Sequence, residues 1–215
     1  ALKKKSFLVH EGGGIEVNGK GTLILCEKAV FYRNPEWKKT DVEKEFKRVL
    51  GVKNIIWMKE GLAEDPKGYL RRISGNYIAG GVGGHTDEFV RFVDSSTIML
   101  AWVDENERYN NPINEMNYIR MSENLAILEN SKDQNGNSFK IIKVPLPDLI
   151  EKKVVVRKKI DNLDSTYDVA KNWFKESEAP EIGDTLIRIP AASYLNFLLT
   201  NGLVILPTYS HVGSS

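Results

Sequence analysis

The feature that most constrains the fold is an internal repeat of one strand–strand–helix–strand unit. Apolar residues alternate or form short runs where strands are expected, and follow a helical period between them. The first unit is predicted from strands at 15–17, 22–25 and 52–58 with a helix at 40–50, and the second from strands at 89–93, 97–103 and 139–144 with a helix at 112–130. Repeated units stack around a shared core, because none buries its apolar face alone. The pattern therefore predicts an α/β (α+β) chain of ββαβ units.

A third unit begins near residue 185 and stops before its helix. Its strands are expected at 185–189, 194–199 and 203–206, with a break at Pro190 and a turn at Asn201-Gly202. With this partial unit, about two and a half units are present.

The two helices carry signals at their ends and along one face. Residues 40–43 (TDVE) have the pattern of a capping box, and Gly51 is a typical helix stop. We interpret the apolar face of the later helix as core rather than as a binding stripe; it consists of Tyr118, Met121, Leu125 and Leu128.

Three segments lie outside the repeat. Residues 2–9 are predicted to form a strand, and residues 61–84 are predicted to be a loop rich in glycine and proline with a short element inside it at 69–73. Residues 147–183 are polar, charged and weakly periodic, which favours a long insertion with one short helix at about 167–175.

A histidine and a carboxylate stand two residues apart, as His85 and Asp87, just after a glycine-rich approach. In an extended strand, residues i and i+2 lie on one face, so we expect these side chains to point the same way. An imidazole beside a carboxylate can transfer protons and bind a cation. The same spacing fits an ordinary buried His–Asp hydrogen bond, and spacing alone leaves both interpretations open.

The repeat relates a second acid, Glu11, to this pair. Thr22 in the first hairpin corresponds to Thr97 in the second, an offset of 75 (97 − 22) that carries Glu11 to position 86. Glu11 and the His85–Asp87 pair therefore stand at equivalent entrances of two units, which a shared centre would bring together. The alternative is that Glu11 is a surface acid beside a glycine turn.

Charge and hydropathy exclude several classes of protein. The 30 basic residues nearly cancel the 29 acidic ones, so no overall field attracts nucleic acid or an anionic membrane surface. Apolar runs of about 18 residues, which a membrane-spanning helix needs, do not occur. We expect neither a nucleic-acid partner nor a membrane partner.

Cys26 is the only cysteine, which excludes an intrachain disulfide and any multi-cysteine metal site. The apolar residues 23–25 before it favour a buried strand thiol with a packing role. The chain begins at Ala1, without an initiator methionine. We expect a cytoplasmic location, and this start leaves a removed signal peptide open.

Four collinear blocks of residues resemble one known family. They are 11–22 (EGGGIEVNGKGT), 33–35 (RNP), 84–92 (GHTDEFVRF) and 192–202 (ASYLNF followed by NG at 201–202). Together they are similar to the agmatine deiminase / bacterial (Porphyromonas-type) peptidyl-arginine deiminase family of the pentein superfamily. The resemblance spans most of the chain.

The resemblance implies a fold and an activity. The pentein is an α/β-propeller of five ββαβ-type blades around a pseudo-fivefold axis, with the active site at its centre. Residues 1–215 would then be one partial, deiminase-like domain truncated at both ends. The implied reaction hydrolyses a guanidinium group, of agmatine (in putrescine biosynthesis) or of peptidyl arginine, to a ureido group and ammonia. It needs no metal and no cofactor.

The resemblance also implies roles for three residues. His85 would be the catalytic histidine, with Glu11 and Asp87 as catalytic acids that also bind the guanidinium. This agrees with the chemistry, because a planar cation with several N–H donors needs carboxylates. An imidazole would protonate departing ammonia and then activate water against a covalent thiouronium intermediate.

The chain departs from the family pattern in two places. The nucleophilic cysteine of the family lies in a glycine-rich block near the carboxyl terminus, which does not occur here, and Cys26 stands at an ordinary strand position. An aspartate that precedes the Glu-Gly-Gly block in the family is also absent. We therefore expect no nucleophile in this chain and no turnover by the chain alone.

Two alternatives to a deiminase stay open. One is a non-catalytic pentein-like binding or structural module, which the missing nucleophile favours. The other is an amidinotransferase, which shares the covalent intermediate. Under any of these, a propeller cut between blades exposes strand edges and apolar surface, so we expect a homo-oligomer.

Overall fold

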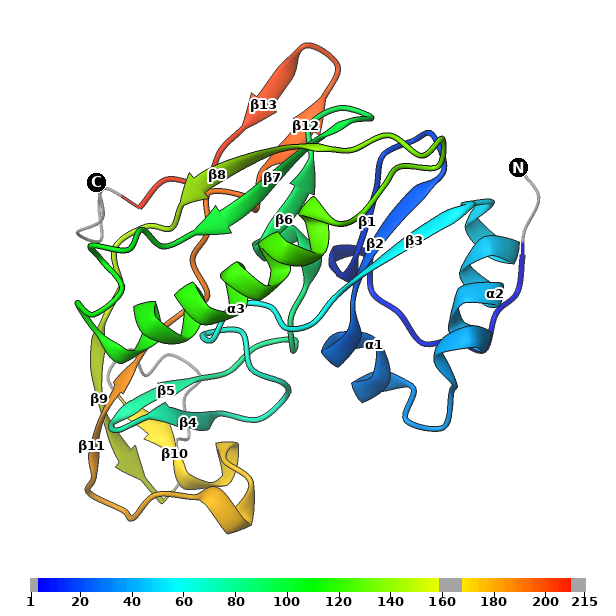
Figure 1. Ribbon diagram of the computed structural model, residues 1–215. Coiled ribbons are helices and arrows are strands. Elements are labelled where there is room, and N and C mark those ends of the chain that lie inside the picture. Colours follow the sequence, from blue (N-terminus) through cyan, green and yellow to red (C-terminus); the bar gives the residue numbers. More distant parts are fainter. Residues whose placement is uncertain (1–3, 159–167, 210–215) are drawn as a thin grey trace.

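Two three-stranded sheets repeat one topology in the computed structural model, which describes residues 4–158 and 168–209 (Figure 1). In the first, β1 (Ile15–Val17) pairs antiparallel with β2 (Thr22–Cys26), which pairs parallel with β3 (Asn54–Met58). In the second, β6 (Val90–Phe92), β7 (Thr97–Trp102) and β8 (Lys140–Pro145) pair in the same order and sense.

The register of the two hairpins repeats the offset seen in the sequence. Ile15 lies opposite Leu25 in the first hairpin, and Val90 lies opposite Leu100 in the second. Both strands are therefore displaced by 75 residues (90 − 15 and 100 − 25). The predicted ββαβ repeat is confirmed for these two units.

Helices join the parallel strands of each unit, because a parallel connection needs a crossover. The helices α1 (Glu27–Arg33) and α2 (Lys39–Leu50) link β2 to β3, and α3 (Pro112–Glu129) links β7 to β8. Gly51 ends α2 in the left-handed conformation, with φ of 73°, as the predicted stop requires. The side chain of Asn111 caps α3 by accepting a hydrogen bond from the Asn114 amide at 2.8 Å.

The strand β2 lies at the centre of the core and is buried on both faces. Leu23 and Leu25 pack in one apolar cluster with residues of α1 and α2, whereas Ile24 and Cys26 pack in another with residues of β7 and α3. Because successive side chains point to opposite faces, a strand covered on both sides must be apolar at every position. This explains the continuous apolar run at 23–26.

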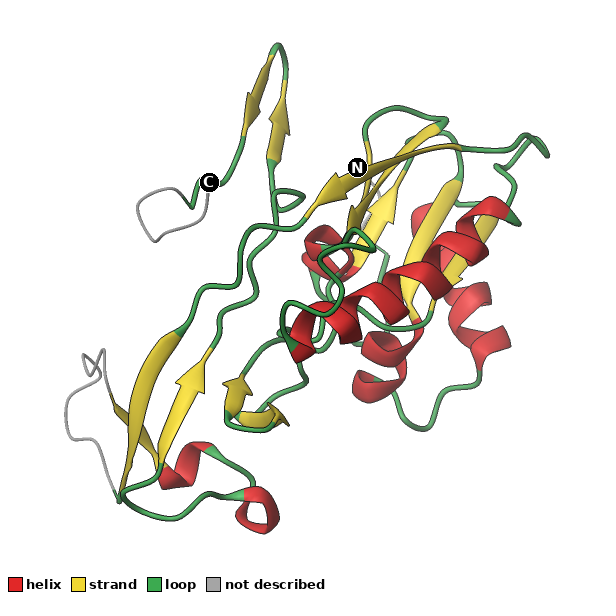
Figure 2. Cartoon of the chain, turned by 60° about the vertical axis from the view of Figure 1, so that its left-hand side comes forward, coloured by secondary structure: helices red, strands yellow, loops and turns green. Residues whose placement is uncertain are grey.

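The segments outside the repeat form a five-stranded mixed sheet at one end of the molecule (Figures 1 and 2). Its order is β10 (Asp168–Ala170), β9 (Lys152–Arg157), β11 (Thr185–Arg188), β5 (Tyr77–Ala79) and β4 (Arg71–Ser74). It buries an apolar cluster of its own, which consists of Leu70, Ile78, Val154, Val156, Val169, Phe174 and Leu186.

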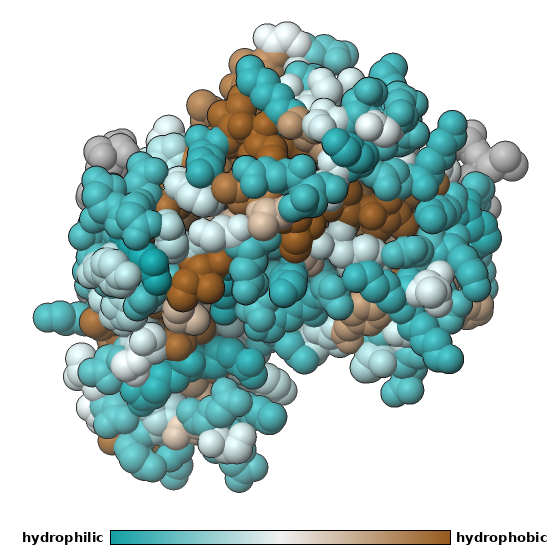
Figure 3. Space-filling view, in the orientation of Figure 1, coloured by the Kyte–Doolittle hydropathy of each residue, from teal (hydrophilic) through white to brown (hydrophobic). Residues whose placement is uncertain are grey.

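A two-stranded hairpin stands at the other end of the molecule (Figure 2). It pairs β12 (Leu198–Thr200) with β13 (Leu203–Ile205) through a turn at Asn201-Gly202. The apolar side chains of both strands are 44–59% exposed. They contribute to the apolar surface at the top of Figure 3.

Several local predictions are wrong. Residues 4–11 form no strand. The capping box at 40–43 is not formed, since α2 begins at Lys39 without a side-chain cap and Glu43 Oε1 instead accepts a hydrogen bond from Trp57 Nε1 at 2.8 Å. The helix α1 was not predicted from the sequence, because seven residues carry too little periodic signal.

The segments predicted as a loop and as an insertion also need correction. Within residues 61–84, the short element expected at 69–73 is the strand β4, and β5 was not expected. In place of the short helix at 167–175, residues 168–170 form β10 and 171–173 a 3₁₀ turn, while Tyr167 lies outside the described residues. The strand predicted at 185–189 pairs with β5 and β9 rather than opening a third unit, and only the end of 194–199 is a strand.

Candidate active site

Glu11 is positioned by the segment that leads into β1. The buried side chain of Asn34 holds this segment through Val9, accepting from its amide at 2.8 Å and donating to its carbonyl at 2.9 Å. The Asn34 side chain thus satisfies both the N–H and the C=O group of Val9, which in a sheet would be hydrogen-bonded to a neighbouring strand. Directly after Glu11, Gly12–Gly14 form a single 3₁₀ turn.

The loop before His85 is held by the carboxylate of Asp65. Its Oδ1 accepts hydrogen bonds from the amides of Val82 (2.6 Å) and Gly83 (3.3 Å), and its Oδ2 from those of Gly84 (2.8 Å) and His85 (3.0 Å). Asp65 is only 4% exposed, so these four donors replace water around its charge. Gly83 and Gly84 have φ of 90° and 99°, a conformation that favours glycine and lets consecutive amides converge on one anion.

The structure brings together the three residues that the sequence singled out. His85 Nε2 hydrogen-bonds to Glu11 Oε2, and His85 Nδ1 lies 3.8 Å from Asp87 Oδ1. The expected strand is wrong, because Thr86–Glu88 form a 3₁₀ turn with His85 just before it. It is this turn, not a shared strand face, that brings the imidazole and the carboxylate together.

Gly13 allows the two entrances to approach each other. A β-carbon added at Gly13 would lie 2.5 Å from His85 Nδ1 and 2.6 Å from Asp87 Oδ2, closer than real β-carbons come. The hydroxyl of Thr86 also donates to the Gly13 carbonyl at 3.0 Å. A glycine is therefore required where the 3₁₀ turns of the two units meet.

The two carboxylates beside His85 have opposite electrostatic environments. Glu11 also hydrogen-bonds to Nη2 of Arg33, and this contact, together with the one from His85, holds the pKa of Glu11 below its usual range. Burial instead raises the pKa of Asp87, whose Oδ1 is buried without a hydrogen-bond partner. Asp87 would therefore gain the most from an added cation.

Asp87 lines a cavity of about 410 Å³ together with a second carboxylate, Glu16. Glu16 Oε2 lies 3.1 Å from Arg91 Nε, its Oε1 accepts from the Phe92 amide at 2.9 Å, and burial raises its pKa. The guanidinium of Arg91 lies 4.4 Å from the ring centre of Phe197, which also lines the cavity. Arg91 thus already pairs with Glu16 and covers the Phe197 ring, which leaves Asp87 as the carboxylate of this cavity with an unpaired oxygen.

Glu11 and Asp87 face different spaces. Glu11 lines a separate depression of about 440 Å³ with Tyr32, Arg33 and Val82. The two acids thus approach opposite nitrogens of the His85 ring, Glu11 at Nε2 and Asp87 at Nδ1.

Sequence reasoning missed Asp65, Glu16 and the roles of Arg33 and Arg91. Asp65 lies in a segment that looked like an unstructured loop, 20 residues before His85. The Glu16–Arg91 pair did carry a signal, because the two positions are related by the same offset of 75 (91 − 16). They are equivalent residues of neighbouring units that pair across the junction.

Cys26 is not part of this arrangement. Its side chain is buried, and a β-carbon added at Gly84 would lie 2.9 Å from its Sγ, so the thiol packs against the loop from the core. Burial raises the pKa of Cys26 to about 11. The predicted buried strand thiol is confirmed.

Within residues 4–158 and 168–209, no group of three or more His, Cys, Asp or Glu residues is arranged to hold a metal ion.

A sequence model of the Porphyromonas-type peptidyl-arginine deiminase family matches residues 1–213. The chain belongs to this family. Two curated members are similar over 94% of this chain: the agmatine deiminases of Pseudomonas aeruginosa (strain LESB58), 30% identical over 203 residues, and of Medicago truncatula, 30% identical over 205 residues. The family predicted from the motif blocks is thus confirmed.

A solved structure of the family shares this fold. The agmatine deiminase of Enterococcus faecalis superposes with a TM-score of 0.63 and 26% identity over 93% of this chain and 45% of that one. The chain spans about half the length of the curated relatives it matches, 45% in each case. In the described part of the chain, no helix is both long and apolar enough to cross a membrane.

Proposed function

We propose that this chain supplies the guanidinium-binding and acid–base groups of a guanidine deiminase. The observation that carries the proposal is His85 placed between Glu11 and Asp87, with Asp87 half-buried, its Oδ1 unpaired, and its side chain lining a cavity. Membership of the family and similarity to agmatine deiminases support it. The proposed substrate is agmatine or another small guanidino compound, with peptidyl arginine as the second class.

Asp87 is the proposed guanidinium ligand. Its buried Oδ1 has no partner to lose, so a planar cation that donates N–H groups to it gains a charge-assisted hydrogen bond at little cost. That Glu11 contacts the substrate stays a prediction, because Arg33 and His85 already share its Oε2.

His85 is the proposed proton carrier. An ionised carboxylate only accepts hydrogen bonds, so the contact with Glu11 assigns the N–H to Nε2 and leaves Nδ1 as the nitrogen that exchanges protons beside Asp87. In the hydrolysis, one guanidinium C–N bond is replaced by a C–O bond from water. The attacking water gives up both of its protons as its oxygen becomes the ureido carbonyl, and the departing amino group takes up two and leaves as ammonium.

The covalent route of the family needs a thiolate, which we propose this chain does not supply. Cys26 is buried, its pKa is about 11, and it lines neither of the cavities beside His85. The 215-residue chain is therefore expected to bind guanidino compounds without hydrolysing them. The same buried thiol favours the second candidate function, a non-catalytic binding module.

We further propose that residues 1–215 are one domain whose ββαβ units are blades of a pentein-type propeller. The equal topology and the offset of 75 in two units support this arrangement, with β12 and β13 as the start of a third blade. The exposed apolar side chains of β12 and β13 support a homo-oligomer. Light scattering should then report a mass above that of one 24.3 kDa chain, and a monodisperse monomer contradicts this part.

Titration calorimetry with agmatine, and separately with N-acetyl-arginine amide, tests the binding site. Asp87→Asn should weaken binding by at least about tenfold, because a charge-assisted hydrogen bond contributes about 1.5–3 kcal/mol. Asp104→Asn, at an exposed position away from the cavity, is the matched control and should bind as the unmodified chain does. Absence of binding by the unmodified chain, or equal binding by Asp87→Asn, overturns the proposal.

The turnover claim has its own test. The unmodified chain is incubated with agmatine and assayed for ureido product, and a haloacetamidine probe is used to look for a covalent adduct by mass spectrometry. We expect neither product nor adduct. Product together with labelling of Cys26 would show that this thiol is the nucleophile after all.

A further inference from the structure

A third cavity, of about 230 Å³, borders the loop that leads to His85 and is lined mainly by cations. It lies between α1, α3, β4 and residues 61–67 and 83–84. Among the described residues that line it, Asp65 is the single carboxylate, and the cations are Lys28, Lys67, Arg71, Arg72 and Arg120. In a chain whose net charge is only +1, this is a strong local concentration of positive charge.

Three of these cations already have partners. Arg72 donates from Nη1 to the carbonyl of Gly75 at 2.9 Å in the β4–β5 turn. Lys28 Nζ and Arg120 Nη2 share one carboxylate, Glu60, at 2.7 and 3.2 Å. Two positive charges therefore meet one negative charge on this side of the cavity.

The other two cations, Arg71 and Lys67, lack a full counter-ion. The Nε of Arg71 is buried without a hydrogen-bond partner, and its nearest carboxylate, on Glu178, is 3.8 Å from Nη2, beyond hydrogen-bond distance. Lys67 Nζ lies 3.2 Å from the ring centre of Tyr32, and desolvation and the charge of Arg71 lower its pKa. A buried, unpartnered donor on a charged side chain costs free energy unless a ligand satisfies it.

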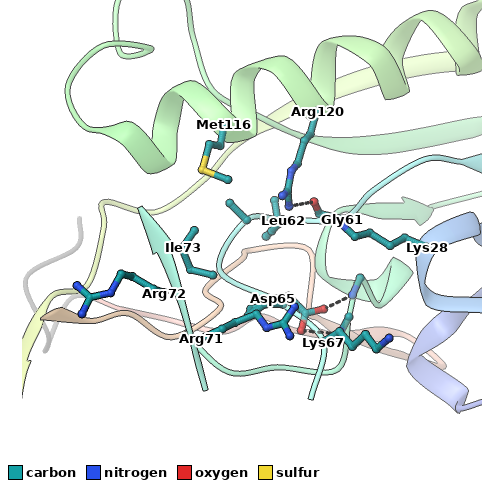
Figure 4. Close-up of a pocket in the computed structure, with 14 residues that line it drawn as sticks. Lys28, Gly61, Leu62, Asp65, Lys67, Arg71, Arg72, Ile73, Met116 and Arg120 are labelled. Atoms are coloured by element: carbon teal, nitrogen blue, oxygen red, sulfur yellow. Dashed lines mark hydrogen bonds between the residues drawn. The ribbon is translucent and has the colours of Figure 1, made fainter. Parts of the chain in front are cut away.

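The carboxylate of Asp65 does not serve as the missing counter-ion of Arg71 and Lys67. All four of its hydrogen bonds come from backbone amides of residues 82–85. Figure 4 shows Asp65, Lys67 and Arg71 along one side of the cavity, with Met116 and Arg120 of α3 across from them. The space between the two sides thus has cations on both.

We propose that this cavity binds a small multivalent oxyanion of the phosphate class, with Arg71 and Lys67 as its principal ligands. A carboxylate carries one charge and would leave most of these cations uncompensated, whereas a phosphate group carries nearly two and offers several acceptor oxygens. The volume lies below the range of about 300–1,000 Å³ typical of larger organic ligands. The site is independent of the proposed guanidinium chemistry, because it selects the opposite charge.

Titration calorimetry at low ionic strength tests the site with three probes: inorganic phosphate, glycerol 2-phosphate and acetate. We expect saturable binding of phosphate that weakens as salt is added, and no comparable binding of acetate. Tighter binding of glycerol 2-phosphate identifies a phosphate monoester as the ligand class. Equal or weaker binding identifies free phosphate. Acetate that binds as well as phosphate overturns the proposal.

Three variants test the assignment of ligands. Arg71→Gln and Lys67→Gln should each weaken phosphate binding about tenfold, the effect of losing one charge-assisted contact. Lys47→Gln removes an exposed lysine on α2, outside the cavity, and should change binding by less than about twofold. Equal losses in all three variants mean unspecific attraction and overturn the proposal.

One measurement needs no variant and therefore does not depend on the folding of a mutant. Reductive methylation of the unmodified chain, read residue by residue by mass spectrometry, should be slowed by phosphate at Lys67 and unchanged at Lys47. Equal modification of Lys67 with and without phosphate overturns the site.

Discussion

Asp65→Asn is the substitution whose effect on stability follows most directly from the structure. The carboxylate accepts two backbone amides on each oxygen, at 2.6–3.3 Å. Asparagine keeps one oxygen and replaces the other by an amino group, which only donates. Whichever way the new side chain turns, two N–H groups of residues 82–85, one buried and one part-buried, lose their acceptor.

The expected loss can be estimated from these contacts. A buried donor left without a partner costs about 1–3 kcal/mol, so two cost about 2–6 kcal/mol. We therefore expect the unfolding free energy to fall by about 4 kcal/mol. Since domains are stable by only about 5–15 kcal/mol, this is a large fraction of the total.

Urea unfolding followed by tryptophan fluorescence measures the change, with four tryptophans in the chain and an unchanged slope expected. Asp94→Asn is the matched control, because Asp94 also accepts backbone amides, from Ser96 and Thr97 at 2.7 Å, but at an exposed turn where water can replace it. A loss for Asp65→Asn below about 0.5 kcal/mol, the size typical of surface substitutions, refutes the reasoning.

Three further predictions concern a thiol, an acid and a close approach. Cys26 should react with iodoacetamide about a hundredfold more slowly in the native chain than in urea, because only the thiolate reacts and its pKa is raised from 9.0 to about 11. Burial raises the pKa of Glu88 from 4.5 to about 7, so between these pH values the folded chain keeps a proton on Glu88 that the unfolded chain has lost. The unfolding free energy should therefore fall as the pH rises from 4.5 to about 7, and Glu88→Gln should remove this pH dependence. Gly13→Ala should lower the melting temperature by several degrees and displace His85, because its β-carbon would lie 2.5 Å from Nδ1, whereas Gly12→Ala, with open space around its β-carbon, should change little.

Each of these has a result that would count against it. Mass-spectrometric labelling of native Cys26 at the unfolded rate would show an accessible thiolate. For Glu88, urea titrations at several pH values that give the same pH dependence for Glu88→Gln and the unmodified chain would exclude this residue as the cause. Equal melting temperatures for the two alanine variants would mean that the approach at Gly13 is looser than the structure indicates.

Local patterns were sufficient for the two complete units. The strands β2 and β7 are apolar runs between turn residues, and α3 carries Met121, Leu125 and Leu128 at helical spacing, so their existence depends on neighbours within a few positions. The offset of 75 between the two units is also visible in the sequence, and it is sufficient to relate Glu11 to His85 without the tertiary structure. The short helix α1 and the strand β5 were missed, and β4 was expected only as a short element of unassigned type at 69–73, because segments of three to seven residues carry little periodicity.

The five-stranded sheet shows why the rest could not be predicted. Tyr77 of β5 lies opposite Ile187 of β11, 110 residues further along the chain (187 − 77). A strand was predicted at 185–189, but its pairing with β5 and β9 was not, because the choice of partner depends on tertiary contacts rather than on the local pattern. A pairing between such distant segments leaves no mark on the sequence close to either one.

By itself, the sequence determined the repeated unit, the family and the three site residues Glu11, His85 and Asp87, because these depend on spacing along the chain. Only the tertiary structure decided how they meet: through a 3₁₀ turn rather than a strand, across Gly13, on a loop held by Asp65. It also decided that Cys26 is buried and that five cations surround one small cavity. The burial of a side chain and the local density of charge depend on residues that are far apart in the chain but close together in space. The sequence alone does not show which distant residues become neighbours.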